Sequence, residues 1–257
     1  MIIDTHAHLY YKELTENLDV ILENAEKNGI KKIIIPAVDL KTSEVILNMC
    51  EKNESLFSAV GIHPSEVKSA GKNDIKFIEE FTSHKKVVAI GEIGLDYYWD
   101  RSYIQEQQVV FNEFIELAND KLLPIIIHTR ESVDDAIKIV KERFAEGKTT
   151  GQFHCYSGDL NQMKEILELK SFYLSFGGNI TYKNYKDYSI IEYLPIDRLL
   201  FETDSPFLPP VPHRGKKTEP SFIVHTIEKI AEIKSIDIQN LKQSVYTNTL
   251  NLFNFNR

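Results

Sequence analysis

The stretch Pro124-Ile125-Ile126-Ile127-His128 predicts a parallel β-strand that is buried on both faces, because three consecutive branched aliphatic residues leave no polar face for solvent. Ile33-Ile34-Ile35 repeats this pattern earlier in the chain. On both sides of these runs, short apolar segments alternate with longer amphipathic ones. The strands that we expect are Ile2–Asp4, Lys32–Ala37, Phe57–Val60, Val87–Glu92, Pro124–His128, Gly151–His154, Phe172–Ser175 and Leu199–Glu202.

Segments between these strands carry apolar residues at the spacing of an amphipathic helix. Clear examples are Leu18–Lys27, Ser43–Lys52, Ile104–Asn119 and Val133–Phe144. Eight strands alternating with helices over 257 residues predict an α/β fold, a (β/α)8 TIM barrel, with residues 1–257 forming a single domain. A doubly wound open sheet is the alternative, but no glycine-rich phosphate loop follows the first strand. The proline-rich stretch Ser205–Pro220 predicts a shaped loop over the mouth of the barrel.

Composition narrows the class of protein. A formal net charge of -8 argues against a broad basic surface that coats nucleic acid, although a local metal-loaded site can still meet phosphates. The two cysteines show no CxxC spacing, so we expect a reducing, cytoplasmic setting rather than a disulfide scaffold. No signal peptide and no apolar run of about 18 residues is visible, so we expect no membrane partner. The oligomeric state is left open, a monomer included.

Six side chains that can bind a metal ion lie at or just beyond the ends of predicted strands. In a parallel barrel these ends share one face, where barrel enzymes place their catalytic groups. We therefore expect five distant segments to bring six metal-binding side chains into one site: His6, His8, Glu92, His128, His154 and Asp204.

Each of these motifs also has an ordinary structural use. His6-Ala7-His8 places two imidazoles on the same side of a strand, which suits a divalent cation, but hydrogen-bonded histidines give the same short motif. Glu92 stands between glycines that allow close approach and can bridge two ions, or it can cap a helix or form a salt bridge. Asp204 can bind an ion and take a proton from a metal-activated water, or it can cap the turn before Pro206. Glu92 and Asp204 are the candidate catalytic residues.

The number of donors bears on the number of ions. Four histidines and two carboxylates exceed what one tetrahedral zinc ion needs, which favours two divalent cations. Mg, Mn and Zn all tolerate this mixed donor set. Two such ions lower the pKa of a shared water and hold the attacking and leaving oxygens of a phosphoester. We therefore expect hydrolysis by a metal-bridged hydroxide, without a covalent enzyme intermediate.

Further candidates lie near the same rim of the barrel. The guanidinium group of arginine matches phosphate oxygens well. Charged residues on an exposed loop often serve only solvation, and a histidine in a loop can lack any function. The candidate substrate-binding residues are His63, Arg130, Arg214 and Lys216. Asp96 is a candidate partner that orients a ligand histidine. Tyr97-Tyr98-Trp99 can stack nucleobases or pack in the core.

Taken together, these motifs resemble the TatD-type metal-dependent deoxyribonucleases of the amidohydrolase superfamily. The matching blocks occur in the expected order and cover essentially the whole chain. They are Asp4-Thr5-His6-Ala7-His8, Gly61-Ile62-His63-Pro64, Gly91-Glu92-Ile93-Gly94-Leu95-Asp96-Tyr97, Ile127-His128-Thr129-Arg130, Phe153-His154-Cys155-Tyr156-Ser157-Gly158, Glu202-Thr203-Asp204-Ser205-Pro206 and Pro212-His213-Arg214-Gly215-Lys216.

The resemblance implies a barrel that hydrolyses phosphodiester bonds in DNA, as a 3′-5′ exonuclease acting on single-stranded ends. It implies one metal held by His6, His8, Glu92 and Asp204, and a second held by Glu92, His128 and His154. One departure concerns the substrate loop, where Thr218 stands at a position that is usually asparagine in the family.

Two other functions remain open at this point. One is an amidohydrolase-type lactonase, amidase or phosphotriesterase that acts on a small molecule; arginines near the mouth favour an anionic substrate instead. The other is a barrel that binds metal as a store or adaptor and has lost catalysis.

Overall fold

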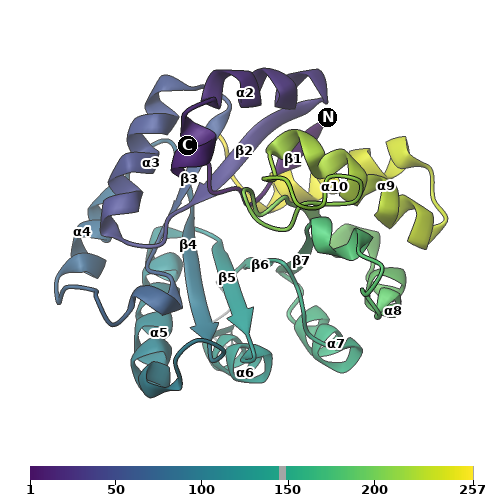
Figure 1. Ribbon diagram of the computed structural model, residues 1–257. Helices are drawn as coiled ribbons and strands as arrows, with labels where there is room; N and C mark the ends of the chain where they lie inside the picture. Colours follow the sequence, from purple (N-terminus) through teal and green to yellow (C-terminus); the bar gives the residue numbers. More distant parts are fainter. Residues whose placement is uncertain (145–148, 257) are drawn as a thin grey trace.

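The barrel is built from strands that lie side by side in chain order (Figure 1). The structure is a computed structural model and describes residues 1–144 and 149–256. Its eight parallel strands are β1 (Ile2–Asp4), β2 (Ile30–Pro36), β3 (Leu56–Val60), β4 (Val87–Asp96), β5 (Ile125–Arg130), β6 (Gly151–Phe153), β7 (Phe172–Phe176) and β8 (Leu199–Phe201).

The two edges of this sheet approach each other and nearly close the barrel. The Thr5 amide donates a hydrogen bond to the Phe201 carbonyl at 3.1 Å, and the Asp204 amide donates to the His6 carbonyl at 2.8 Å. The predicted (β/α)8 barrel is therefore confirmed, and the alternative of an open doubly wound sheet is wrong.

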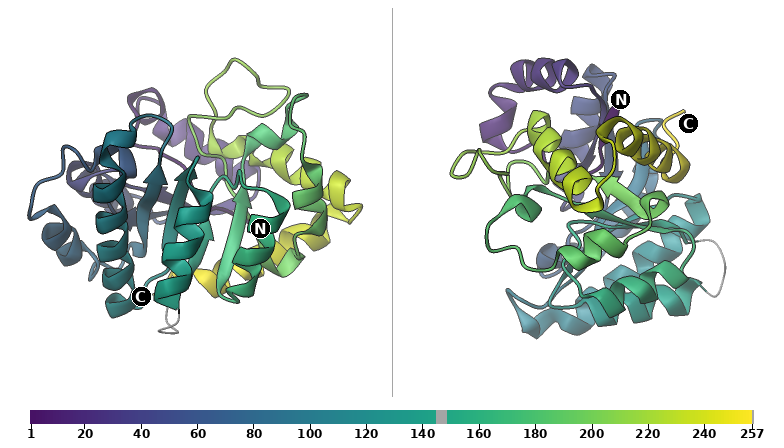
Figure 2. Two further views of the ribbon diagram at one scale, coloured as in Figure 1. Left: turned by 90° about the horizontal axis from the view of Figure 1, so that it is seen from below. Right: turned by 90° about the vertical axis from the view of Figure 1, so that its right-hand side faces the viewer.

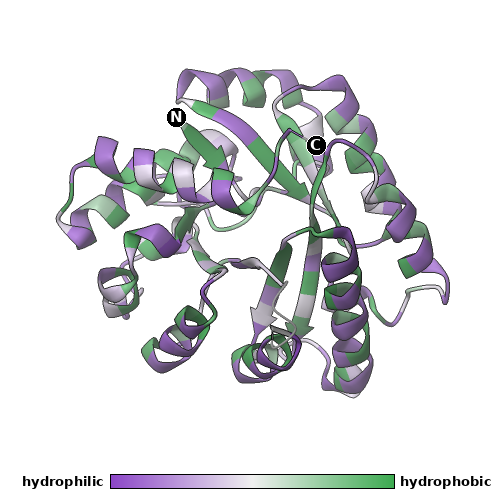
Figure 3. Cartoon of the chain, turned by 180° about the vertical axis from the view of Figure 1, so that it is seen from behind, coloured by the Kyte–Doolittle hydropathy of each residue, from purple (hydrophilic) through white to green (hydrophobic). Residues whose placement is uncertain are grey.

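Helices surround the barrel on its outside (Figure 2), and they carry hydrophobic and hydrophilic residues in alternation along their length (Figure 3). This mixture suits helices that cover a sheet with one face only. The α-helices are α1 (Lys12–Thr15), α2 (Leu18–Lys27), α3 (Leu40–Lys52), α4 (Asp74–Phe81), α5 (Ile104–Lys121), α6 (Val133–Phe144), α7 (Leu160–Glu168), α8 (Tyr188–Tyr193), α9 (Ile223–Lys234) and α10 (Ile238–Leu252). Short 3-10 turns lie at η1 (Pro64–Glu66), η2 (Arg101–Tyr103), η3 (Gly178–Thr181), η4 (Ile196–Arg198) and η5 (Pro220–Phe222). Within the described part of the chain, none of the helices has the length and apolar character of a membrane crossing.

The isoleucine run of β5 shows why the strands are apolar on both faces. Ile125 and Ile127 belong to the hydrophobic cluster shared with the outer helices, whereas Ile126 belongs to a second cluster inside the barrel. Phe253 and Phe255, which follow α10, join this inner cluster. Because hydrophobic side chains fill the interior, the polar side chains of the site lie at the C-terminal ends of the strands.

The predicted end of the fourth strand was wrong, and the difference shapes the site. β4 does not stop at Glu92 but continues to Asp96, and its register against β5 shifts between Ile90 and Ile93. Such a shift is a β-bulge, which redirects the side chain within it. Gly91 permits the close approach, because a Cβ there would lie 2.7 Å from the Cβ of Ile126.

The proline-rich stretch after β8 is irregular, as predicted. The peptide bonds Ser205–Pro206 and Val211–Pro212 are cis. Phe207 and Leu208 from this stretch line the same pocket as His8, so the loop forms one wall of the barrel mouth.

Candidate metal centre

Six polar side chains converge at the C-terminal end of the barrel. His6 and His8 follow β1, Glu92 lies in the bulge of β4, and His128 lies within β5. His154 comes directly after β6, and Asp204 comes three residues after β8. Five of them line a pocket of about 510 Å³, and the sixth, His6, is fully buried beneath it. The structure therefore brings together all six residues that the sequence assigns to a metal site.

The carboxylate of Glu92 divides this cluster into two halves. Its Oε2 atom lies 3.3 Å from His6 Nε2 and 3.6 Å from His8 Nε2. Its Oε1 atom lies 2.8 Å from His128 Nδ1 and 2.8 Å from His154 Nε2. One buried carboxylate thus faces two imidazoles with Oε2 and three with Oε1, since His63 Nε2 also lies 3.6 Å from Oε1. A carboxylate that bridges two ions requires such a separate set of donors at each oxygen.

The donor atoms within each half are crowded in a way that suits a cation. His6 Nε2 and His8 Nε2 are 3.1 Å apart, and Asp204 Oδ1 lies 3.7 Å and 3.5 Å from them. In the other half, His128 Nδ1 and His154 Nε2 are also 3.1 Å apart. Nitrogen and oxygen lone pairs that converge from several directions are the chemistry of a divalent-metal site. The residues present therefore fit metal ions.

The charges of the site also favour cations. Burial alone would raise the pKa of Glu92, but the imidazoles of His154 and His6 hold that pKa well below its usual value. Burial alone would lower the pKa of His154, but the carboxylates of Glu92 and Glu202 raise it well above its usual value. The same negative potential that favours a proton on His154 favours a metal ion in its place.

Glu202 is a site residue that the sequence argument missed. It is fully buried, and its Oε1 atom lies 3.7 Å from His154 Nδ1. Its two oxygens also accept hydrogen bonds from the Cys155 amide and from Ser175 Oγ. Its position as the last residue of the predicted strand Leu199–Glu202 was the signal that could have identified it, since the other site residues share such positions.

Asp96 links a ligand histidine to the loop that follows β4. Its Oδ2 atom lies 3.3 Å from His128 Nε2, and its Oδ1 atom accepts a hydrogen bond from the Tyr98 amide at 2.9 Å. Gln107 holds the backbone of Asp96 through hydrogen bonds in both directions. Asp96 therefore occupies the place of a carboxylate that orients an imidazole toward an ion.

Replacing Asp96 with asparagine is expected to lower metal affinity, hydrolytic activity or both by about 10- to 100-fold, because His128 loses the anionic partner that fixes its tautomer and orientation. Metal titration and steady-state kinetics measure the effect. The matched control is Asp197→Asn, since Asp197 is exposed in η4 at the opposite end of the barrel. Equal metal affinity and activity for Asp96→Asn and Asp197→Asn would contradict this role.

The predicted substrate contacts fall into two groups. His63 and Arg130 line the pocket, and His63 Nε2 lies 3.6 Å from Glu92 Oε1. Arg214 instead stacks on the Tyr182 ring, with its guanidinium carbon 3.8 Å from the ring centroid. Lys216 is exposed in the same loop. As far as the described residues show, neither Arg214 nor Lys216 lines the pocket, so the structure leaves their contact with substrate a prediction.

Comparisons with known proteins identify the family of the chain. The family model for TatD related DNase matches residues 3–254. The uncharacterized metal-dependent hydrolase YabD of Bacillus subtilis is 39% identical over 257 residues, with all of both chains covered. The crystal structure of YjjV, a TatD homolog from Escherichia coli, superposes with a TM-score of 0.93 at 29% identity, covering 98% of each chain. A TatD family hydrolase from Entamoeba histolytica superposes with a TM-score of 0.86 at 26% identity, also covering 98% of each chain. The chain therefore belongs to the TatD-related DNase family of metal-dependent hydrolases.

Proposed function

We propose that the protein hydrolyses phosphodiester bonds in DNA, at the 3′ ends of single strands, with two divalent cations in its site. The observation that carries this proposal is the division of the site by Glu92, whose two oxygens face separate sets of imidazoles. The family model, described as TatD related DNase, supports DNA as the substrate class. Arg130 in the wall of the pocket supports an anionic substrate.

The distances around Glu92 support an assignment of residues to the ions. His6, His8, Glu92 and Asp204 would hold one ion, and Glu92, His128 and His154 would hold the other, as Mg, Mn or Zn. Bound there, the ions would supply Lewis acidity toward the phosphate and would lower the pKa of a nearby water molecule.

The chain's own groups position the reactants and move the proton. Burial alone would raise the pKa of Asp204, but the imidazoles of His8 and His6 keep that pKa below its usual value, so the carboxylate is ionised. Asp204 can therefore accept the proton of the water that attacks phosphorus. The P–O bond to the departing sugar oxygen breaks, and that oxygen takes up a proton from Asp204 or from solvent and leaves as an alcohol. Arg130 and His63 line the pocket where the phosphate and the neighbouring sugar would lie.

A panel of substrates tests this function. With Mg²⁺ or Mn²⁺, the protein is expected to shorten a 5′-labelled single-stranded oligonucleotide from its 3′ end, and His128→Ala is expected to lower the rate at least about 100-fold. The panel includes double-stranded DNA, RNA and a neutral lactone, and the products are separated on sequencing gels or followed by absorbance.

The matched control is His84→Ala, because His84 pairs with the partly exposed Glu51 at 3.2 Å, outside the pocket. Rapid turnover of the lactone without cleavage of DNA would replace the proposal by a small-molecule hydrolase. Stoichiometric metal binding without hydrolysis of any phosphoester would indicate an inactive metal-binding barrel.

A further inference from the structure

We propose that Trp99 is a base-stacking platform beside the metal centre, holding one nucleobase of the substrate strand next to the phosphate under attack. This inference rests on the proposed nuclease function and assigns a position for the strand. Trp99 is the only tryptophan in the sequence, and its side chain is 70% exposed. It lines the pocket that contains Glu92 and His128. An indole ring that is open to solvent and adjoins the reacting centre offers an apolar face to any base.

The backbone around Trp99 is held in place, so the ring is presented by an ordered loop. Asp96 Oδ1 accepts hydrogen bonds from the amides of Tyr98 and Trp99, at 2.9 Å and 3.4 Å. Arg101 Nε donates to the Tyr97 carbonyl at 3.1 Å. Because Asp96 also contacts His128, one carboxylate ties the Trp99 loop to a candidate metal ligand. Because the loop is already ordered before DNA binds, less conformational entropy is lost when a base stacks on the ring.

Arg130 adds positive charge beside the ring. Its guanidinium carbon lies 3.7 Å from the centroid of the Tyr98 ring and 5.1 Å from that of the Trp99 ring. Tyr98 and Trp99 meet edge to face, with centroids 4.9 Å apart. The aromatic residues hold Arg130 at the pocket wall, where it can contact a phosphate while a base stacks on Trp99.

The groove on the far side of Arg130 is unsuitable for the strand. It is a cleft of about 700 Å³, and carboxylates from four residues line it: Glu131, Asp134, Asp135 and Asp159. A polyanion would be repelled there. Arg130 lines both this cleft and the pocket that Trp99 lines. Four carboxylates line the Trp99 pocket as well, those of Glu66, Glu92, Asp96 and Asp204, but the proposed cations would offset them. With metal bound, the charges therefore direct the strand to the Trp99 side.

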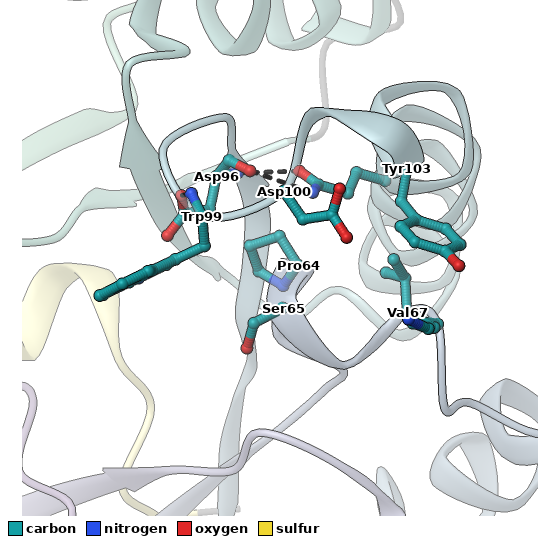
Figure 4. Close-up of a pocket in the computed structure, with 9 residues that line it drawn as sticks. Pro64, Ser65, Val67, Asp96, Trp99, Asp100 and Tyr103 are labelled. Atoms are coloured by element: carbon teal, nitrogen blue, oxygen red, sulfur yellow. Dashed lines mark hydrogen bonds between the residues drawn. The ribbon is translucent and has the colours of Figure 1, made fainter.

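A small hollow behind the Trp99 loop cannot hold the base either (Figure 4). It lies between this loop and the turn at Pro64, with Tyr103 on its far side, and its volume is only about 70 Å³. That volume is well below the roughly 300–1,000 Å³ of ligand pockets. Figure 4 shows the Trp99 ring pointing away from Tyr103. The 510 Å³ catalytic pocket is therefore the place where a base meets this ring.

Fluorescence of the lone tryptophan tests the contact directly. A single-stranded oligonucleotide with phosphorothioate linkages, added to the Mg²⁺-loaded protein, is expected to quench Trp99 fluorescence in a saturable manner. An oligonucleotide of the same length whose sugars all lack bases is expected to bind without this quenching. Equal quenching by both would contradict stacking.

Kinetics test the consequence. Trp99→Ala is expected to lower kcat/KM for single-stranded DNA by about 5- to 150-fold, the equivalent of the ~1–3 kcal/mol measured for base–aromatic stacking, whereas Trp99→Phe should keep most of the activity. The substrates form a series in which one of the last four nucleotides from the 3′ end is abasic. At one position of this series, the one whose base would stack on Trp99, the two proteins should have the same kcat/KM. Neither Trp99→Ala nor the unsubstituted protein can stack a base that is missing.

Tyr193→Ala is the control, since Tyr193 is 66% exposed in α8 and does not line the pocket. Metal content and melting temperature show whether Trp99→Ala remains folded and loaded. If the unsubstituted protein cleaves DNA and Trp99→Ala does so equally well, or the deficit of Trp99→Ala is the same at every abasic position, the stacking platform is wrong. If the unsubstituted protein cleaves no DNA, the proposed nuclease function itself fails.

Discussion

Replacing Glu92 with glutamine is expected to lower the rate of the proposed metal-dependent DNA hydrolysis by about three orders of magnitude while the barrel remains folded. Glutamine has nearly the size of glutamate but lacks its charge. The side chain is 3% exposed, and it faces His6 and His8 with one oxygen and His128 and His154 with the other. A single substitution therefore weakens both halves of the centre. A loss of several kcal/mol in charge stabilisation corresponds to this factor, since each 1.36 kcal/mol changes a rate tenfold.

The measurements that check this result are initial rates on a labelled oligonucleotide, bound metal per chain and a thermal melt. Glu51→Gln is the matched control, because Glu51 also pairs with a histidine, His84, but outside the site. The expected Glu92→Gln protein binds less than the full complement of metal and is nearly inactive. A variant with full metal content and an ordinary rate would show that Glu92 does not bridge the ions.

The central place of Glu92 could be predicted only in part from the sequence. Its flanking glycines indicated close approach, and the position near a strand end indicated the barrel mouth. The bulge that turns the side chain inward depends on how β4 pairs with β5, and in particular on the room that Gly91 leaves beside Ile126. Strand pairing is a tertiary property, so a single segment of sequence does not reveal it.

Other features of the fold also separate into those that local sequence predicts and those that depend on tertiary contacts. Strands such as β2 and β5 were predictable because their isoleucine runs need burial on both faces. Glu202 was missed because a glutamate at a strand end serves equally well in a surface salt bridge, and only the packing around Ser175 shows that it is buried. Arg214 is a predicted substrate contact that stacks on Tyr182, a partner that its motif does not indicate, and its contact with substrate stays a prediction. Loop side chains follow tertiary contacts that local sequence does not specify.

Removal of the metal ions is expected to abolish both cleavage and binding of single-stranded DNA. The chain carries a formal net charge of -8, so its overall field repels a polyanion. Carboxylates of Glu92 and Asp204 add to this repulsion inside the pocket when no cation is bound. Among the described residues that line the pocket, Arg130 is the one arginine or lysine, and the His154 imidazole is already paired with Glu92. We therefore expect the dissociation constant to rise at least about 100-fold in EDTA, which corresponds to about 2.7 kcal/mol.

Fluorescence anisotropy of a labelled phosphorothioate oligonucleotide checks this expectation, first with Mg²⁺, then with EDTA, and then with Mn²⁺ in excess. Binding should return with the second metal, which excludes unfolding as the cause of its loss. Unchanged binding in EDTA would mean that a separate basic surface holds the strand, and the exposed loop that carries Arg214 and Lys216 would be the surface to test by alanine substitution. The other outcome is that DNA binding requires metal, and that cleavage requires both metal and Glu92. In that case the same ions would bind the DNA and take part in its hydrolysis. The acidic chain would then meet DNA only where cations reverse its local charge.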